Sequence, residues 1–165
     1  MKDSHPFIRS LYELARREDR AALAELRRSF ASPLAAMPYV VPYLGKEGGE
    51  RDERAFALVA GLFALHPAPG SRSLADALRA IAATSDSVAL RFRALLDADA
   101  EDLPVHLRHA VALARSHEIA IDFDDLLVTV RFWGDPEKRR QRAWARDFWA
   151  TRHDDPDSEA KDATP

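Results

Sequence analysis

The sequence predicts an all-α protein, folded as a compact bundle of about eight or nine helices. Ala, Leu and Arg are abundant, and all three residues favour helix. Apolar residues recur about every 3.6 positions along most of the chain, whereas runs of β-branched residues are scarce. The chain has 165 residues, of which 47% are hydrophobic. This length is enough to bury a core without a disulfide or a structural metal ion.

The composition excludes cysteine-based sites and gives no sign of a membrane span or a signal peptide. The chain contains no Cys, which excludes disulfides, thiol catalysis and Cys-ligated zinc. No run of apolar residues approaches the length that a membrane-spanning helix needs. The first twenty residues are charged and periodic, unlike a signal peptide. We therefore expect a soluble, cytoplasmic protein with no membrane partner.

Charge is distributed unevenly along the chain. The chain has 24 basic and 27 acidic residues. One basic and five acidic residues lie in residues 154–165, so residues 1–153 contain 23 basic and 22 acidic residues. The terminal segment has no apolar face, and we expect an acidic, disordered tail there. Residues 1–153 are expected to form a single helical domain. A division of this domain into subdomains 1–83 and 84–153 stays open.

The first half of the chain predicts four helices and a connector. Helices are expected at residues 6–17 and 20–30, each with an apolar stripe. Three prolines interrupt residues 31–44, which predicts a packed connector of short helical turns. Residues 53–65 are apolar on most sides and are expected to form the central helix. After a break at residues 66–70, Ser73 is the expected N-cap of a short helix.

The second half predicts three helices before the C-terminal one. A helix is expected to follow residues 84–87 and to end near Asp97. The next begins at Asp102 or Leu103 and carries Pro104 in its first turn, where proline is tolerated. Asp122 is the expected N-cap of a helix that leads toward Trp133. Short turns are therefore expected to join these helices.

The C-terminal segment combines cations with aromatic residues. The Gly-Asp-Pro run at residues 134–136 predicts the end of one helix and the start of another, which spans about residues 136–150. On a helical wheel, Trp144 and Phe148 share a sector that we interpret as packing. Arg140 lies near that sector and is expected to pair with an acid or with another subunit. The cationic sector contains Lys138, Arg139, Arg142 and Arg146.

Catalytic motifs are weak in this sequence. His106 and His109 lie three residues apart on a predicted helix, but no third metal ligand is identifiable. The acids between residues 97 and 102 could hold Mg²⁺, yet they fit better as helix caps. The His153–Asp154 dipeptide of HD-type phosphohydrolases lacks its companion ligands. No GxSxG motif or phosphate-binding glycine loop is present. We expect no enzyme, cofactor, metal site or small-molecule substrate, with a metal-dependent phosphohydrolase kept as a third hypothesis.

Arginine is the remaining binding chemistry. The guanidinium fork suits phosphate, so several arginine clusters that converge in the fold would bind a nucleic-acid backbone without sequence specificity. Spacing along the chain does not say whether the clusters converge. The candidate nucleic-acid-binding residues are Arg27, Arg28, Arg91, Arg108, Arg131, Lys138, Arg139, Arg142 and Arg146.

Several segments together carry a family resemblance. They are LRRSF at 26–30, PYVVPYL at 38–44, LRFRALLDAD at 90–99, LRHAVALA at 107–114, DFDDLLVTVRFWG at 122–134 and ARDFW at 145–149. In this order and spacing they resemble the CasB family, the small subunit of the type I-E CRISPR Cascade complex. The resemblance covers most of residues 7–150. No single segment is specific by itself.

The resemblance implies an all-α, non-catalytic subunit that is present as a pair and contacts the other Cascade subunits. Such a subunit helps to hold the guide RNA–target duplex and the displaced DNA strand of the R-loop, while base pairing reads the sequence. A helical protein–protein adaptor without nucleic-acid contact remains the alternative, because Leu and aromatic stripes are abundant. By resemblance, the basic positions of the family motifs fall on Arg27, Arg28, Arg91, Arg108, Lys138, Arg139, Arg140 and Arg142.

Overall fold

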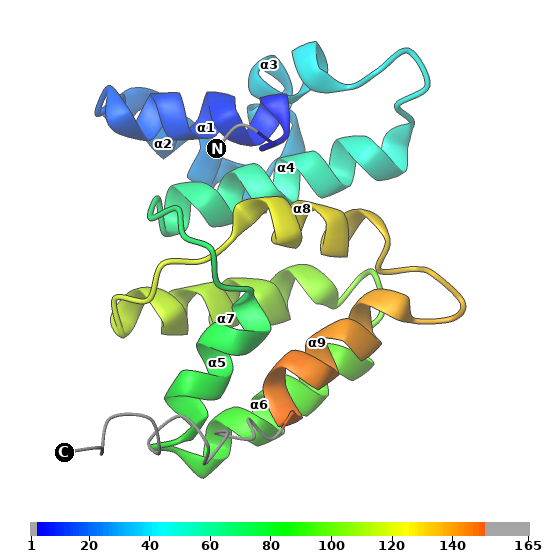
Figure 1. The fold of residues 1–165 in the computed structure, drawn as a ribbon. Helices are drawn as coiled ribbons and strands as arrows, with labels where there is room; N and C mark the ends of the chain where they lie inside the picture. The colour runs from blue at the N-terminus through cyan, green and yellow to red at the C-terminus, as the bar shows by residue number, and fades with distance from the viewer. Residues whose placement is uncertain (1–2, 151–165) are drawn as a thin grey trace, which may run out of the picture.

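The computed structural model describes residues 3–150, and these residues form an all-helical fold (Figure 1). The α-helices are α1 Pro6–Arg16, α2 Arg20–Arg27, α3 Met37–Val40, α4 Glu50–Leu65, α5 Leu74–Ala82, α6 Asp86–Asp97, α7 Leu103–Ser116, α8 Phe123–Arg131 and α9 Arg139–Trp149. The 3₁₀ helices are η1 Arg28–Phe30, η2 Pro33–Ala36 and η3 Val41–Tyr43. Within residues 3–150 there is no strand, only an isolated bridge between Pro69 and Ile121. The predicted all-α class is confirmed.

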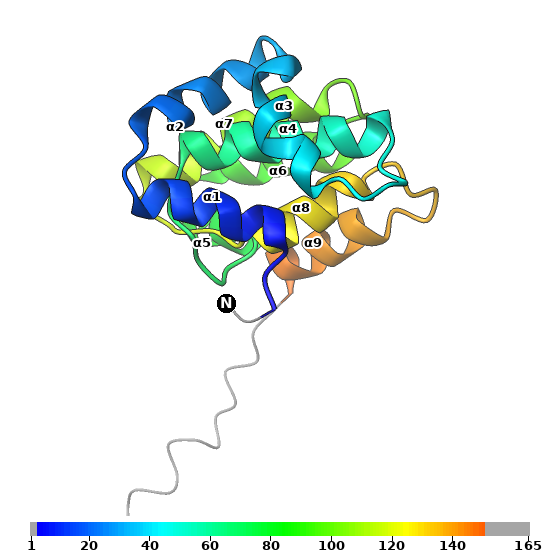
Figure 2. The same ribbon diagram turned by 90° about the horizontal axis from the view of Figure 1, so that it is seen from above.

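Helices α4 and α8 pack against each other in the middle of the fold. Helices α1, α2 and α3 lie on one side of this pair, and α5, α6, α7 and α9 lie on the other (Figures 1 and 2). Helix α5 contacts α6, α7 and α9 and so organises the second group. Buried residues from before and after residue 83 belong to one hydrophobic cluster. The expected division into subdomains at that point stays a prediction.

Helix α4 is the predicted central helix, and it is buried on most sides. Its apolar residues include Phe56, Leu62 and Phe63, each at most 2% exposed. The helix begins at Glu50, three residues before the predicted start. Three acids lie in this first turn, where negative charge is favoured by the positive end of the helix dipole.

Two predicted N-caps are confirmed, and the connections next to them are tied together. The Ser73 hydroxyl accepts a hydrogen bond from the Asp76 amide at 3.2 Å, and the Asp122 carboxylate accepts one from the Asp125 amide at 3.0 Å. The Gly70 amide also donates to the Ile121 carbonyl at 2.8 Å. This bond and a second, from the Asp122 amide to the Arg72 carbonyl at 2.7 Å, hold the α4–α5 connection against the α7–α8 connection, so α5 and α8 begin side by side.

Two further predicted boundaries were wrong. Helix α9 begins at Arg139 rather than near residue 136, because Lys138 has the left-handed φ of 51°. The Asp135 carboxylate instead closes a turn by accepting the Glu137 amide at 3.1 Å, and the Lys138 amide donates to the Asp135 carbonyl at 2.9 Å. The helix predicted at 20–30 ends at Arg27, after which the chain tightens into η1.

The predicted connector at residues 31–44 is confirmed as the short helices η2, α3 and η3. No helix in residues 3–150 is long and apolar enough to cross a membrane. The predicted acidic tail, residues 154–165, and His153 lie outside the described residues.

Candidate nucleic-acid interface

One group of predicted cations is brought together by the fold. Arg27 and Arg28 lie where α2 passes into η1, and Arg108 lies on α7, about 80 positions further along the sequence. The Arg108 guanidinium is stacked over the ring of Phe30, 4.8 Å from its centre. A cation over an aromatic face is attracted by the ring quadrupole. We call Arg27, Arg28 and Arg108 the Arg28–Arg108 surface.

The position of η1 is set by its contact with α4. The buried Ser29 hydroxyl donates to the Ala57 carbonyl at 3.2 Å. Opposite it lies Gly61, where an added Cβ would be 2.5 Å from the Ser29 oxygen and 3.2 Å from the Phe30 ring. Arg27 adds a hydrogen bond from its Nε to the Ala64 carbonyl at 3.0 Å, near the negative end of the α4 dipole. Arg27 is therefore a structural residue as well as a surface cation.

Helix α9 separates its aromatic residues from its cations, as the helical wheel predicted. Trp144 and Phe148 are buried, so the packing interpretation is confirmed. The Trp144 indole N–H donates to the Asp125 carboxylate at 3.0 Å. Arg140 also donates to the carboxylate of Asp125, and its Nε donates to the Thr129 hydroxyl at 3.1 Å. The prediction that Arg140 pairs with an acid is confirmed.

The outer side of this segment carries exposed cations, which we call the α9 basic side: Lys138, Arg139, Arg142 and Arg146. Arg139 forms ion pairs with Asp135, at 3.2 Å, and with Glu137. The side chains of Lys138, Arg142 and Arg146 make no hydrogen bond or ion pair within residues 3–150. These three cations are the ones available to a ligand.

Three comparisons with known proteins agree with each other. The model of the family described as CRISPR-associated protein Cse2 matches residues 22–149. A curated CRISPR-associated protein Cse2 from Thermus thermophilus is 44% identical over 136 residues, which is 78% of this chain and 79% of the relative. The chain belongs to the Cse2 family.

Solved structures extend the match from sequence to fold. The crystal structure of a Cse2-family protein from Thermus thermophilus matches with a TM-score of 0.77 and 39% identity, covering 89% of this chain and 99% of that one. CasB from M. ruber matches with a TM-score of 0.72 and 30% identity, covering 87% and 90%. A chain of a CRISPR RNA-guided surveillance complex matches with a TM-score of 0.72 and 26% identity, covering 88% of each chain. The CasB resemblance of the sequence is confirmed.

The Cse2 family match spans both the Arg28–Arg108 surface and the α9 basic side. Arg91 lies on α6, between Arg28 and Arg108 in sequence, and is exposed. Its neighbour Phe92 stacks on Phe148 with ring centres 4.2 Å apart, which attaches α6 to α9. No hydrogen bond or ion pair among the described residues joins Arg91 to either basic surface. Arg91 therefore stays a separate candidate within the Cse2 fold.

Arg131 has a different environment from the other candidates. It is half-buried and forms an ion pair with Asp52 at 3.2 Å. Its guanidinium also lies 5.6 Å from the centres of the Phe56 and Phe132 rings. Burial lowers the pKa of His5, and the charge of Arg131 lowers it further. A phosphate contact by Arg131 would have to replace its existing carboxylate partner.

The structure also shows functional candidates that the sequence analysis missed. Arg51 and Arg54, at the start of α4, line the same groove as Arg131 and Phe30. Trp149 is 45% exposed and has the Arg93 guanidinium 5.7 Å from its ring centre. The charged run at residues 50–54 was the available signal for the first pair. No local pattern signals a stack between α6 and α9, because it requires their tertiary contact.

The metal alternatives gain no structural support. Within residues 3–150, no group of three or more His, Cys, Asp or Glu side chains is placed to hold a metal ion. The Asp99 carboxylate accepts the Glu101 and Asp102 amides, both at 2.9 Å, which is a turn-closing role.

Proposed function

We propose that this chain is a non-catalytic small subunit of a type I-E CRISPR Cascade surveillance complex. In this role it binds nucleic-acid backbone and stabilises the R-loop, made of the guide RNA–target duplex and the displaced DNA strand, in antiviral defence. Its partners are the other Cascade subunits, a second copy of itself and the nucleic acids. It acts in the cytoplasm without a cofactor.

Membership of the Cse2 family supports the proposal, together with the similarity to a chain of a CRISPR RNA-guided surveillance complex. The observation that carries the nucleic-acid contact is the Arg28–Arg108 surface. Residues from α2, η1 and α7 meet there through the stack of Arg108 on Phe30. Neither Arg28 nor Arg108 has an acidic partner within residues 3–150, so both can bind phosphate without breaking an ion pair.

The presence or absence of an acidic partner also ranks the remaining candidate residues. Lys138, Arg142 and Arg146 are exposed without an acidic partner, and we propose them as further phosphate contacts. Arg131 and Arg139 already bind carboxylates. Phosphate would have to compete with those carboxylates, so these two residues are expected to contribute less affinity.

Binding of labelled single-stranded oligo(dT) to the full chain, measured by fluorescence anisotropy over a range of salt concentrations, tests the proposal. We expect affinity to fall as salt rises, because phosphate binding releases counterions. The double variant Arg28→Glu/Arg108→Glu should bind more weakly. Its slope of log affinity against log salt should be shallower by about 1.4, since each lost single-strand contact removes about 0.7.

The matched control is Arg9→Glu/Arg20→Glu. It reverses two exposed arginines on α1 and α2 and gives the same net charge. Circular dichroism should show that both double variants keep their helical content. A salt-independent affinity would contradict phosphate binding. An equal loss in both double variants would show that only total charge matters, and would remove the assignment to the Arg28–Arg108 surface.

The alternative function is a helical adaptor that binds protein alone. The observation in its favour is that seven large apolar side chains are at least 41% exposed within residues 3–150, among them Leu90, Phe132 and Trp149. Where such side chains form a contiguous patch, they mark a protein contact. If arginine-to-glutamate variants bound DNA and assembled normally, while Phe132→Ser lost its partners, the adaptor function would be favoured.

A further inference from the structure

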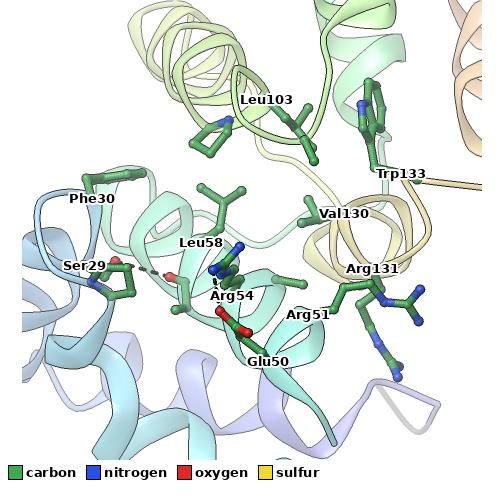
Figure 3. Close-up of a pocket in the computed structure, with 16 residues that line it drawn as sticks. Ser29, Phe30, Glu50, Arg51, Arg54, Leu58, Leu103, Val130, Arg131 and Trp133 are labelled. Carbon is green, nitrogen blue, oxygen red and sulfur yellow. Dashed lines mark hydrogen bonds and ion pairs between the residues drawn. The ribbon is translucent and has the colours of Figure 1, made fainter.

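A groove of about 510 Å³ lies between three parts of the fold. Its walls come from η1 and η2, from the first half of α4, and from the region where the α6–α7 loop meets the end of α8. Figure 3 shows Phe30, Leu58, Leu103 and Val130 around its centre, with Arg51, Arg54 and Arg131 along one side. We call it the Phe30–Trp133 groove. Its volume is in the range typical of binding pockets, about 300–1,000 Å³.

The floor of the groove is apolar, and its polar groups are already used. The Ser29 hydroxyl donates to the Ala57 carbonyl at 3.2 Å. The Trp133 indole N–H donates to the Ala98 carbonyl at 2.8 Å. A nucleobase in the groove would leave the polar atoms of its edge unpaired, which is costly away from water. An apolar side chain has no such groups, so the floor favours an aliphatic or aromatic anchor.

The rim of the groove is positive. Arg54 pairs with Glu50, and Arg131 pairs with Asp52 at 3.2 Å. Arg51 is exposed and has no hydrogen bond or ion pair within residues 3–150. These five side chains therefore leave one uncompensated positive charge beside an apolar pocket. A guanidinium fork at such a position matches a carboxylate.

We propose that the Phe30–Trp133 groove binds a segment of a partner protein in which a Phe or Leu side chain is flanked by Asp or Glu. The apolar side chain fills the groove between Leu58 and Leu103, and the flanking carboxylates lie against Arg51 and its neighbours on the rim. This peptide site goes beyond the proposed nucleic-acid contact and does not rest on it. The groove adjoins the Arg28–Arg108 surface, because the Phe30 ring that lines it also carries the Arg108 guanidinium, but neither the Arg28 nor the Arg108 side chain lines it.

The probe for this site is a labelled peptide, acetyl-Asp-Glu-Phe-Asp-Glu-amide, added to the isotope-labelled full chain. Amide shifts in two-dimensional NMR locate binding, and fluorescence anisotropy measures affinity. We expect shifts at residues 29–30, 51–58 and 100–104. Two comparison peptides separate the contributions: Ala in place of Phe removes the anchor, and Asn and Gln in place of the acids remove the charge. Both should bind more weakly.

Two variants test the two halves of the groove. Ala100→Trp adds bulk at an exposed lining position and should abolish peptide binding. Arg51→Glu should weaken binding about fivefold, the scale of an exposed ion pair. Arg9→Glu, on a helix that does not line the groove, is the matched charge control and should bind normally. Oligo(dT) affinity should stay unchanged in Ala100→Trp, so that failure of this site and failure of the nucleic-acid proposal can be told apart.

Three results would overturn the proposal. The first is the absence of groove amide shifts at about 1 mM peptide, a concentration that corresponds to very weak binding. The second is equal binding of the Phe and Ala peptides. The third is oligo(dT) that shifts the groove amides and displaces the peptide, which would make the groove a nucleic-acid site. If Ala100→Trp fails to fold, Arg51→Glu and the peptide comparison still decide the question.

Discussion

Replacing Gly61 by Ala tests whether close packing of η1 against α4 positions the Arg28–Arg108 surface. Gly61 is in the interior of α4, where Ala is ordinarily the better helix former by about 1 kcal/mol. In this fold the new methyl group would lie 2.5 Å from the Ser29 hydroxyl oxygen and 3.2 Å from the Phe30 ring. Propensity and packing therefore predict opposite signs for the change in stability.

The packing cost is expected to exceed the gain in propensity. Overpacking a core contact typically costs about 1–3 kcal/mol. Moving the Ser29 hydroxyl away also breaks its buried hydrogen bond to the Ala57 carbonyl, worth about 1 kcal/mol. After the propensity gain is subtracted, we expect Gly61→Ala to lower the free energy of unfolding by about 1–3 kcal/mol. For a domain of this size the melting temperature would fall by roughly 2–12 °C.

Urea denaturation followed by far-UV circular dichroism measures this change. The Ser29→Ala background is the control, because it lacks the hydroxyl that the new methyl group would strike. In that background Gly61→Ala should cost less, and the difference between the two costs is the Ser29–Gly61 coupling energy. The reasoning would be refuted if Gly61→Ala stabilised the protein by about 1 kcal/mol, as helix propensity alone predicts.

Two further predictions concern Asp125 and His5. Asp125→Ala should lower the free energy of unfolding by about 2–4 kcal/mol in urea denaturation, because it leaves the buried Trp144 N–H unpaired and Arg140 without its carboxylate partner. Asp125→Asn should cost less, and an equal cost for both variants would contradict this explanation. Burial and Arg131 lower the pKa of His5, and its Nδ1 accepts a hydrogen bond from the Phe7 amide. Folding therefore opposes protonation of this ring. The free energy of unfolding should fall as pH decreases through 6.5, the pKa of the unfolded state. The His5→Asn variant should show a flatter dependence of unfolding free energy between about pH 7.5 and 5.5, and a slope as steep as in the wild type would remove His5 as its source.

Most of the helices could be predicted from the sequence because their signals are local. Ser73 and Asp122 cap the helices that were expected to follow them. Apolar residues on most sides of the segment 53–65 predicted that α4 is the central helix. The boundary errors have equally local causes. At residue 138 the left-handed turn delays α9, and a tightened turn ends α2 before η1.

The candidate site was less predictable, because availability of a cation depends on its partner. The helical wheel separated Trp144 from the cations of α9 and indicated an acidic partner for Arg140. It could not identify that partner as Asp125, which lies on another helix. The pairing of Arg131 with Asp52 joins residues 79 positions apart and has no trace in the local pattern.

The sequence by itself determined the helical class, most helix positions, the Cse2-type arrangement of segments and the separation of packing and charged sides along α9. The class, the helix positions and the two sides of α9 depend on residues within a few turns of one another, and the family resemblance depends on the order of short segments along the chain. Only the tertiary structure decided which arginines are available, because ion pairs and ring stacks form between distant segments. It placed Arg108 on Phe30, engaged Arg131 with Asp52, and enclosed an apolar groove beside Arg51.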